Sequence, residues 1–151
     1  MNNVEEFYLD NGLRVFLKED KFSPVSSIFV WVNTGSAYEN DFERGLAHVH
    51  EHMIFKGTEK LKVGEISKQI EAHGGEVNAF TSFDETVYYT TISNSFIDVG
   101  FDILSDCMSN ATFNEDELAK ELEVIIEEIK RGEDSPSSCL GEMIFKNTFP
   151  S

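Results

Sequence analysis

The sequence predicts an α+β fold in which helices pack on one face of a mixed, largely antiparallel sheet. Two observations carry this prediction. Short β-branched and aromatic runs occur in pairs joined by tight turns, which favours antiparallel hairpins. Amphipathic helical stretches lie between and after these runs. The chain has 151 residues, of which 40% are hydrophobic, so we expect one domain over 1–151 with a sizeable core.

The strands are predicted from their residue types and from the turns that bound them. A hairpin is predicted on either side of Asp10-Asn11-Gly12, because Asn-Gly is the strongest short hairpin signal. A β-branched and aromatic run at 27–34, bounded by proline and glycine, predicts a well-buried strand. Two further strands are predicted at 76–81 and 86–93, with a short turn between them.

Helices are predicted at 45–55, 63–73, 96–110, 114–131 and 137–149. The second of these stops at the pair Gly74-Gly75. Asn114 and Glu117 form a capping-box pattern that begins the fourth. The last one carries apolar residues almost to the end of the sequence and no closing strand follows it, so we expect a fragment of a longer protein.

Composition narrows the classes of partner. Twelve basic and 28 acidic residues give a net charge of −16, which argues against nucleic acid and anionic membranes and is compatible with basic ligands or with solubility alone. We see no signal peptide and no run long enough to span a bilayer, so a cytoplasmic location is expected. Cys107 and Cys139 have no short Cys-x-x-Cys spacing and are expected to be free thiols.

Three histidines and a glutamate fall within five positions of the first predicted helix. At about 100° per residue, His48 and His52 lie about 40° apart, and Glu51 lies on the same side, about 60° from His48. His50 points about 200° away from His48 and is expected to be a packed or surface histidine. Two imidazoles one turn apart suit zinc, and a neighbouring carboxylate that does not bind the metal can act as a general base. The order His-x-x-Glu-His is that of the inverted zinc peptidases.

A third metal ligand must come from another segment, and the helix at 114–131 offers candidates. Its predicted apolar stripe consists of Leu118, Leu122, Ile125 and Ile129. Glu121 and Glu128 are seven residues apart and therefore nearly superposed at the border of that stripe, whereas Glu123 and Glu127 point toward solvent. Either Glu128 or Glu121 is therefore the candidate ligand, and the alternative is a solvated acidic flank.

In order and spacing, four segments resemble the inverted zinc peptidases of the pitrilysin, insulin-degrading enzyme and mitochondrial processing peptidase family. GLAHVHEHMIFKGT (45–58) is similar to the family's zinc helix and the turn after it, and WVNTGSAYE (31–39) to the strand before it. GGEVNAFTSFDETVYY (74–89) and ELEVIIEE (121–128) resemble the family's edge strand and its third-ligand helix. The resemblance covers nearly the whole chain.

This resemblance implies one zinc ion per chain, bound by His48, His52 and Glu128, with Glu51 as the general base. It implies that Glu121 supports the catalytic site by a hydrogen bond to a ligand histidine or to substrate.

The resemblance also places Asn78 and Ala79 on the strand against which a peptide substrate lies. His50 departs from the family, which usually has an apolar residue there.

The function implied is that of a zinc metalloendopeptidase for unfolded or extended peptides. Family members have two halves that close like a clam shell, and this chain resembles the N-terminal part of the catalytic half. We therefore expect a C-terminally truncated domain that is inactive without the second half or a partner subunit. A sheet edge exposed by truncation could support a homo-oligomer.

Two alternatives remain open. A non-catalytic processing-peptidase-like subunit or assembly partner of the same fold typically lacks a ligand or the base, whereas this chain has all four positions filled. A structural zinc domain requires four protein ligands and no adjacent base, and the two cysteines are not placed to complete such a set.

Overall fold

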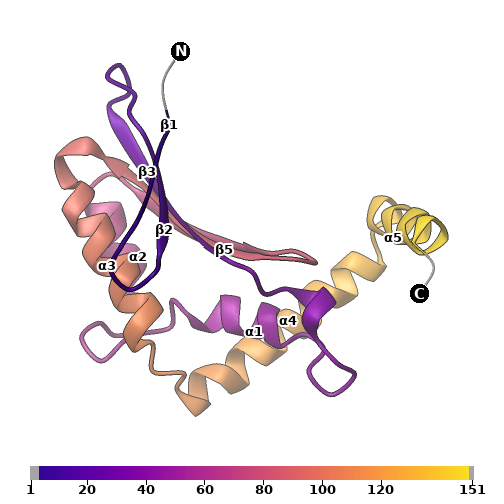
Figure 1. Ribbon diagram of the computed structural model, residues 1–151. Helices are drawn as coiled ribbons and strands as arrows, with labels where there is room; N and C mark the ends of the chain where they lie inside the picture. Colours follow the sequence, from indigo (N-terminus) through magenta and orange to yellow (C-terminus); the bar gives the residue numbers. More distant parts are fainter. Residues whose placement is uncertain (1–3, 150–151) are drawn as a thin grey trace.

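The computed structural model describes residues 4–149 and shows an α+β chain, which confirms the predicted class (Figure 1). The strands are β1 (Val4–Tyr8), β2 (Arg14–Lys18), β3 (Val25–Val32), β4 (Glu76–Thr81) and β5 (Thr86–Ser93). The α-helices are α1 (Leu46–Met53), α2 (Glu65–Ala72), α3 (Ile97–Asn110), α4 (Glu115–Glu133) and α5 (Pro136–Thr148). All the predicted elements are present, with boundaries shifted by a few residues at most.

The strands form two antiparallel sheets. β1 and β2 pair with each other as the predicted hairpin, and β3, β5 and β4 form a second sheet in that order. β5 is therefore central, while β3 and β4 are its edges. The prediction that the run at 27–34 is well buried was wrong, since alternate residues of β3 face solvent and Phe29 and Trp31 are 50% and 60% exposed.

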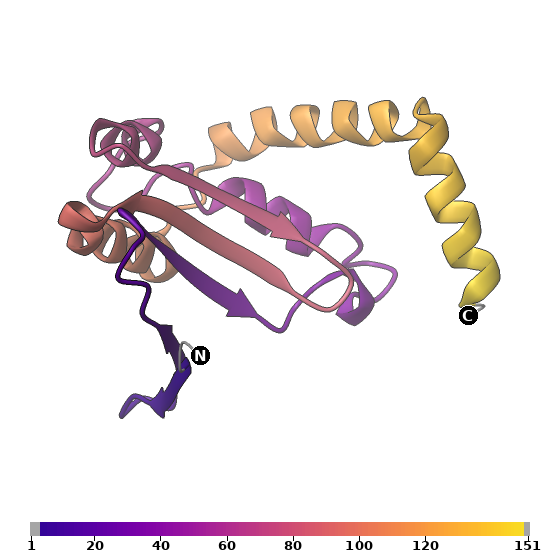
Figure 2. The same cartoon turned by 90° about the horizontal axis from the view of Figure 1, so that it is seen from above.

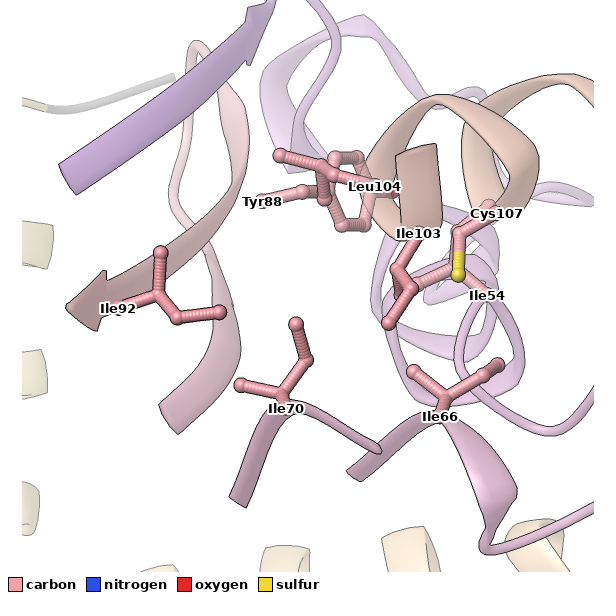
Figure 3. Close-up of a cluster of buried hydrophobic side chains, with 8 residues drawn as sticks. All are labelled: Ile54, Ile66, Ile70, Tyr88, Ile92, Ile103, Leu104 and Cys107. Atoms are coloured by element: carbon pink, nitrogen blue, oxygen red, sulfur yellow. The ribbon is translucent and has the colours of Figure 1, made fainter. Parts of the chain in front are cut away.

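Helices α1, α2 and α3 lie on one face of the three-stranded sheet (Figures 1 and 2). Between them and the sheet is a cluster of buried side chains, shown in Figure 3. It comprises Ile54, Ile66, Ile70, Tyr88, Ile92, Ile103, Leu104 and Cys107. The members come from α2, α3, β5 and the end of α1. Burial of each aliphatic side chain contributes about 1.5–3 kcal/mol, so this cluster holds α1 against the sheet.

Periodicity explains which side chains enter the core. On α2, Ile66 and Ile70 are four residues apart and are both buried, as expected for one face of a helix. On β5, Tyr88 and Ile92 share the face that meets the helices. No residue of β5 is exposed, because this strand lies at the centre of the three-stranded sheet.

The last two helices extend away from this core. α4 runs past α1, and α5 follows it at an angle (Figure 2). The side chain of Asn114 accepts hydrogen bonds from the N–H groups of Asp116 and Glu117, so the predicted N-cap of α4 is confirmed. Every residue described in α5 is more than a third exposed. Among residues 4–149, no helix is both long and apolar enough to cross a bilayer.

Candidate metal centre

The orientation of α1 is set by contacts at its N-terminus. Both carboxylate oxygens of Glu39 accept hydrogen bonds there, from the N–H groups of Gly45 and Ala47, each at 2.7 Å. A negative charge at this position also interacts favourably with the helix dipole. Glu39 follows a segment that begins at Gly35, where a side chain would collide with the carbonyl of Ser82 in the β4–β5 turn. The sheet and its turn therefore determine how α1 begins.

The face of α4 that meets α1 differs from the predicted stripe. Glu121 and Ile125 are the buried residues of this helix, whereas Leu122 and Ile129 are 41% and 55% exposed. The inward face therefore contains the two candidate glutamates, Glu121 and Glu128, instead of carrying them at its border. The stripe prediction was wrong at Leu122 and Ile129, because polar partners on and beside α1 offset the burial of a carboxylate.

Three side chains from α1 and α4 converge on one point. Nε2 of His52 lies 3.1 Å from Nε2 of His48, and the rings are nearly perpendicular. Oε2 of Glu128 lies 3.4 Å from Nε2 of His52 and 3.8 Å from Nε2 of His48. Their ligand atoms all lie within 4.8 Å of one another, so these three residues form a group that could hold a metal ion.

The spacing of these atoms fits a tetrahedral ion. Zinc with bonds of about 2.0–2.2 Å separates its ligand atoms by roughly 3.3–3.6 Å, and the three observed distances are distributed around this value. Two imidazole nitrogens and one carboxylate oxygen are also the ligand types of a catalytic zinc site. The side chains of His48 and Glu128 are 36% and 41% exposed, so this end of the group is accessible from solvent.

Glu121 lies on the other side of His52. Its Oε2 atom accepts a hydrogen bond from Nδ1 of His52 at 3.2 Å, and its Oε1 atom pairs with Nζ of Lys56 at 2.5 Å. Burial raises the pKa of Glu121, but the hydrogen bonds from Lys56 and His52 outweigh it and leave this pKa below its ordinary value. Because Nδ1 of His52 donates to a carboxylate, the lone pair of His52 is at Nε2, which faces Glu128 and His48.

Glu51 is placed apart from the three converging residues. Its Oε2 atom accepts a hydrogen bond of 2.6 Å from the hydroxyl of Thr81, at the end of β4. This bond links the carboxylate on α1 to the edge of the sheet.

Asn78 and Ala79 lie on the same edge strand. They pair with Tyr89 and Tyr88 of β5, so the opposite side of β4 is an edge of this sheet. The side-chain oxygen of Asn78 accepts a hydrogen bond from the N–H of Ala79 at 2.9 Å. A peptide that used this N–H would have to replace the side chain of Asn78.

His50 takes no part in the group formed by the other two histidines. Nδ1 of His50 lies 2.7 Å from the hydroxyl of Tyr88, and its ring packs against Phe113. Burial lowers the pKa of His50, and burial together with the charge of Glu51 raises the pKa of Tyr88 to about 12. A neutral His50 therefore accepts the hydrogen bond that the Tyr88 hydroxyl donates.

Three residues that position the helix or the side chains of this site were not predicted from the sequence: Glu39, Lys56 and Thr81. Thr81 could have been found, because it lies two residues after Ala79 and therefore on the same face of the strand. Glu39 and Lys56 lie outside any regular element that carries a ligand, so their contacts depend on tertiary packing.

An inverted His-x-x-Glu-His helix that packs against a glutamate-bearing helix, beside the edge of an antiparallel sheet, defines the class of inverted zinc peptidases. The chain belongs to the insulinase family (peptidase family M16), whose sequence model matches residues 14–151.

Individual relatives agree with this assignment. The chain is 36% identical over 146 residues to the uncharacterized zinc protease YmxG of Bacillus subtilis (strain 168), covering 97% of this chain and 36% of the relative. It is 41% identical over 121 residues to the mitochondrial-processing peptidase subunit beta of Dictyostelium discoideum, covering 80% of this chain and 26% of the relative. The crystal structure of a protease from Helicobacter pylori superposes with a TM-score of 0.86 at 35% identity, over 93% of this chain and 34% of that one. The chain thus spans about a third of the length of these relatives, or less.

Proposed function

We propose that this chain provides the zinc site and the general base of a metalloendopeptidase that cleaves unfolded or extended peptides. The observation that supports this most directly is the convergence of His48, His52 and Glu128 within 4.8 Å, with Glu51 on the same helix as the two histidines. Relatives described as zinc proteases support the same metal.

A zinc ion bound by these three residues supplies a Lewis acid that polarises a carbonyl and lowers the pKa of water toward neutrality. Glu51 accepts the proton of the attacking water and passes it to the leaving amine. The hydroxyl of Thr81 donates a hydrogen bond to Oε2 of Glu51, which holds the carboxylate in place. Oε1 of Glu51 is then the oxygen that exchanges the proton.

The substrate binds to the edge of β4 in this proposal. An extended peptide adds to such an edge as a further strand, and main-chain hydrogen bonds hold it irrespective of its side chains. Asn78 and Ala79 lie at the middle of β4, and Thr81 at its end contacts the base. A peptide paired with β4 therefore passes close to Glu51, and only an unfolded or extended chain has the free backbone groups to pair in this way.

Cleavage also requires parts beyond this chain in our proposal. The chain covers about a third of its bacterial relatives, and the relative from Dictyostelium is one subunit of a processing peptidase. We expect the remaining segments, or a partner subunit, to close over the peptide, and the 151-residue chain to be inactive alone.

The first test is the zinc content of the protein and of its E128Q variant after purification with limiting metal. One zinc per chain in the parent and a sharp loss in E128Q support the site. Peptide hydrolysis by the full-length protein then separates the enzyme from its alternative: tightly bound zinc without any hydrolysis would indicate a non-catalytic subunit of the same fold. Absence of zinc from the correctly folded parent would overturn the proposal.

A further inference from the structure

Lys56 is a charged side chain at the metal centre that the proposed mechanism does not use. Its Nζ atom pairs with Oε1 of Glu121 at 2.5 Å, while Oε2 of the same carboxylate receives the hydrogen bond from His52. The side chain of Glu121 is 10% exposed and that of Lys56 is 30% exposed. The two oxygens of one buried carboxylate are therefore divided between a histidine and a lysine.

This division determines how Glu121 can act on His52. A carboxylate with a single partner can rotate about its last torsion and present either oxygen, or neither, to the histidine. A second, charged partner on the other oxygen restricts that rotation. It also compensates the charge of a buried carboxylate, which would otherwise be strongly unfavourable.

The backbone beside Lys56 is fixed independently of its side chain. The N–H of Lys56 donates to the carbonyl of Met53 at the end of α1, and the carbonyl of Gly57 accepts from the N–H of Thr112 at 3.1 Å. Thr58 forms an isolated bridge with Ala111. The segment that carries Lys56 is thus bonded to the connection that leads into α4, the helix that carries Glu121.

We propose that Lys56 is a positioning residue of the metal centre, which holds Glu121 against Nδ1 of His52 and so directs the Nε2 lone pair toward the other ligands. This inference rests on the proposed function in that zinc is the metal bound. Lys56 acts through Glu121 and touches neither metal nor substrate. Groups that orient a ligand histidine typically change metal affinity by roughly 10- to 100-fold when they are removed.

The test compares zinc dissociation constants, measured by competition with a chromophoric chelator, for the parent and for the K56M, K56R and K130M variants. K130M is the matched control, because Lys130 forms an ion pair with Glu127 on the exposed side of α4, the helix that carries Glu121. We expect K56M to weaken zinc binding roughly tenfold, K56R to restore most of the affinity, and K130M to match the parent. Equal affinities for K56M and K130M would overturn the proposal.

A second readout does not require metal. In the metal-free protein, long-range ¹H–¹⁵N correlations identify which nitrogen of His52 carries the proton. We expect Nδ1–H in the parent and in K130M, and a shift toward the other tautomer in K56M; an unchanged His52 spectrum in K56M would contradict the inference.

Circular dichroism establishes that each variant is folded. If K56M does not fold, K56A replaces it, because alanine also leaves Oε1 of Glu121 without its lysine partner, and parent-like affinity in K56A would count against the proposal in the same way. If the parent itself binds no zinc, the proposed function fails, whereas the His52 spectra still decide the role of Lys56.

Discussion

The two glutamates on the inward face of α4 differ in their surroundings although they are only two turns apart. Glu121 is buried and has both oxygens engaged, by His52 and Lys56. Glu128 is 41% exposed and lies near the Nε2 atoms of His48 and His52. The same residue type on the same helix face is therefore held by the protein at one end and left open to a metal and to solvent at the other. Environment, more than residue type, separates an orienting carboxylate from a candidate ligand.

The largest expected effect concerns a third glutamate, Glu51. We place its carboxylate outside the group of candidate metal ligands, so its loss should affect hydrolysis and not metal binding. The E51Q variant should lower the hydrolysis rate of the full-length protein by roughly 10²- to 10⁴-fold, because it removes the proposed general base, while zinc affinity stays unchanged. Single-turnover kinetics and zinc titration measure the two effects. If E51Q lost its zinc, Glu51 would be a ligand and not the base.

Substitution of the two histidines distinguishes the Glu121 end from the Glu128 end of the contact between α1 and α4. H48A and H52A should each weaken zinc binding by roughly 10²- to 10³-fold, about a quarter of the free energy with which four ligands bind a structural zinc. H52A should also lower the free energy of unfolding of the metal-free protein, because it deprives buried Glu121 of a partner, whereas H48A should not. Urea denaturation with chelator present distinguishes them, and equal stability losses would contradict the difference between the two ends.

Substitution of Glu121 should reduce zinc affinity less than substitution of either histidine. E121Q should weaken zinc binding by roughly 10- to 100-fold, because the amide can still contact His52 but no longer fixes its tautomer or pairs with Lys56 as an ion. E123Q is the control, since Glu123 is exposed on the same helix. Complete loss of zinc from E121Q would mean that Glu121 is the third ligand and would reverse the assignment of the two glutamates.

Asp106 tests whether stability and metal binding can be separated. It is a buried carboxylate on α3, and the polar side chains of Thr58 and Asn110, together with Lys60, hold its pKa below the ordinary value. D106N should lower the free energy of unfolding by about 1–2 kcal/mol at neutral pH, with little change in zinc affinity.

The pH dependence of that difference has a defined sign. A carboxyl group whose pKa is lower in the folded state stabilises the fold above its unfolded pKa, and this contribution disappears as the pH falls through the folded pKa. The gap between D106N and the parent should therefore narrow below the ordinary aspartate value of 3.8. Urea denaturation at several acidic pH values measures it, and a gap that widened toward low pH would refute the account.

The smallest expected effect concerns substrate charge. With a net charge of −16, the chain should favour basic over acidic peptides of matched length by about threefold in kcat/KM at low salt, and the preference should vanish at high salt. Lys-rich and Glu-rich versions of one peptide measure this with the full-length protein. Equal rates at low salt would remove the charge argument.

Periodicity along the chain was sufficient to predict most elements and the pairing of His48 with His52, because both depend on local geometry. It could not choose between Glu121 and Glu128, which are equivalent on the helix and differ only in what faces them. It also misplaced Leu122 and Ile129 in a buried stripe. These errors have one cause: the side of α4 that is buried depends on polar contacts with distant residues such as Lys56, and no local pattern contains them.

The first helix has a consequence for how the site assembles during folding. α1 has only eight residues, fewer than an isolated helix needs to be stable in water, and it starts on hydrogen bonds to Glu39. A peptide containing the His-x-x-Glu-His motif alone would therefore be mostly unfolded and would not present its imidazoles together. The three candidate ligands can converge only after the sheet, its turn and α4 have come together. Zinc binding by the proposed site would therefore report on long-range tertiary structure, which the His-x-x-Glu-His motif alone does not establish.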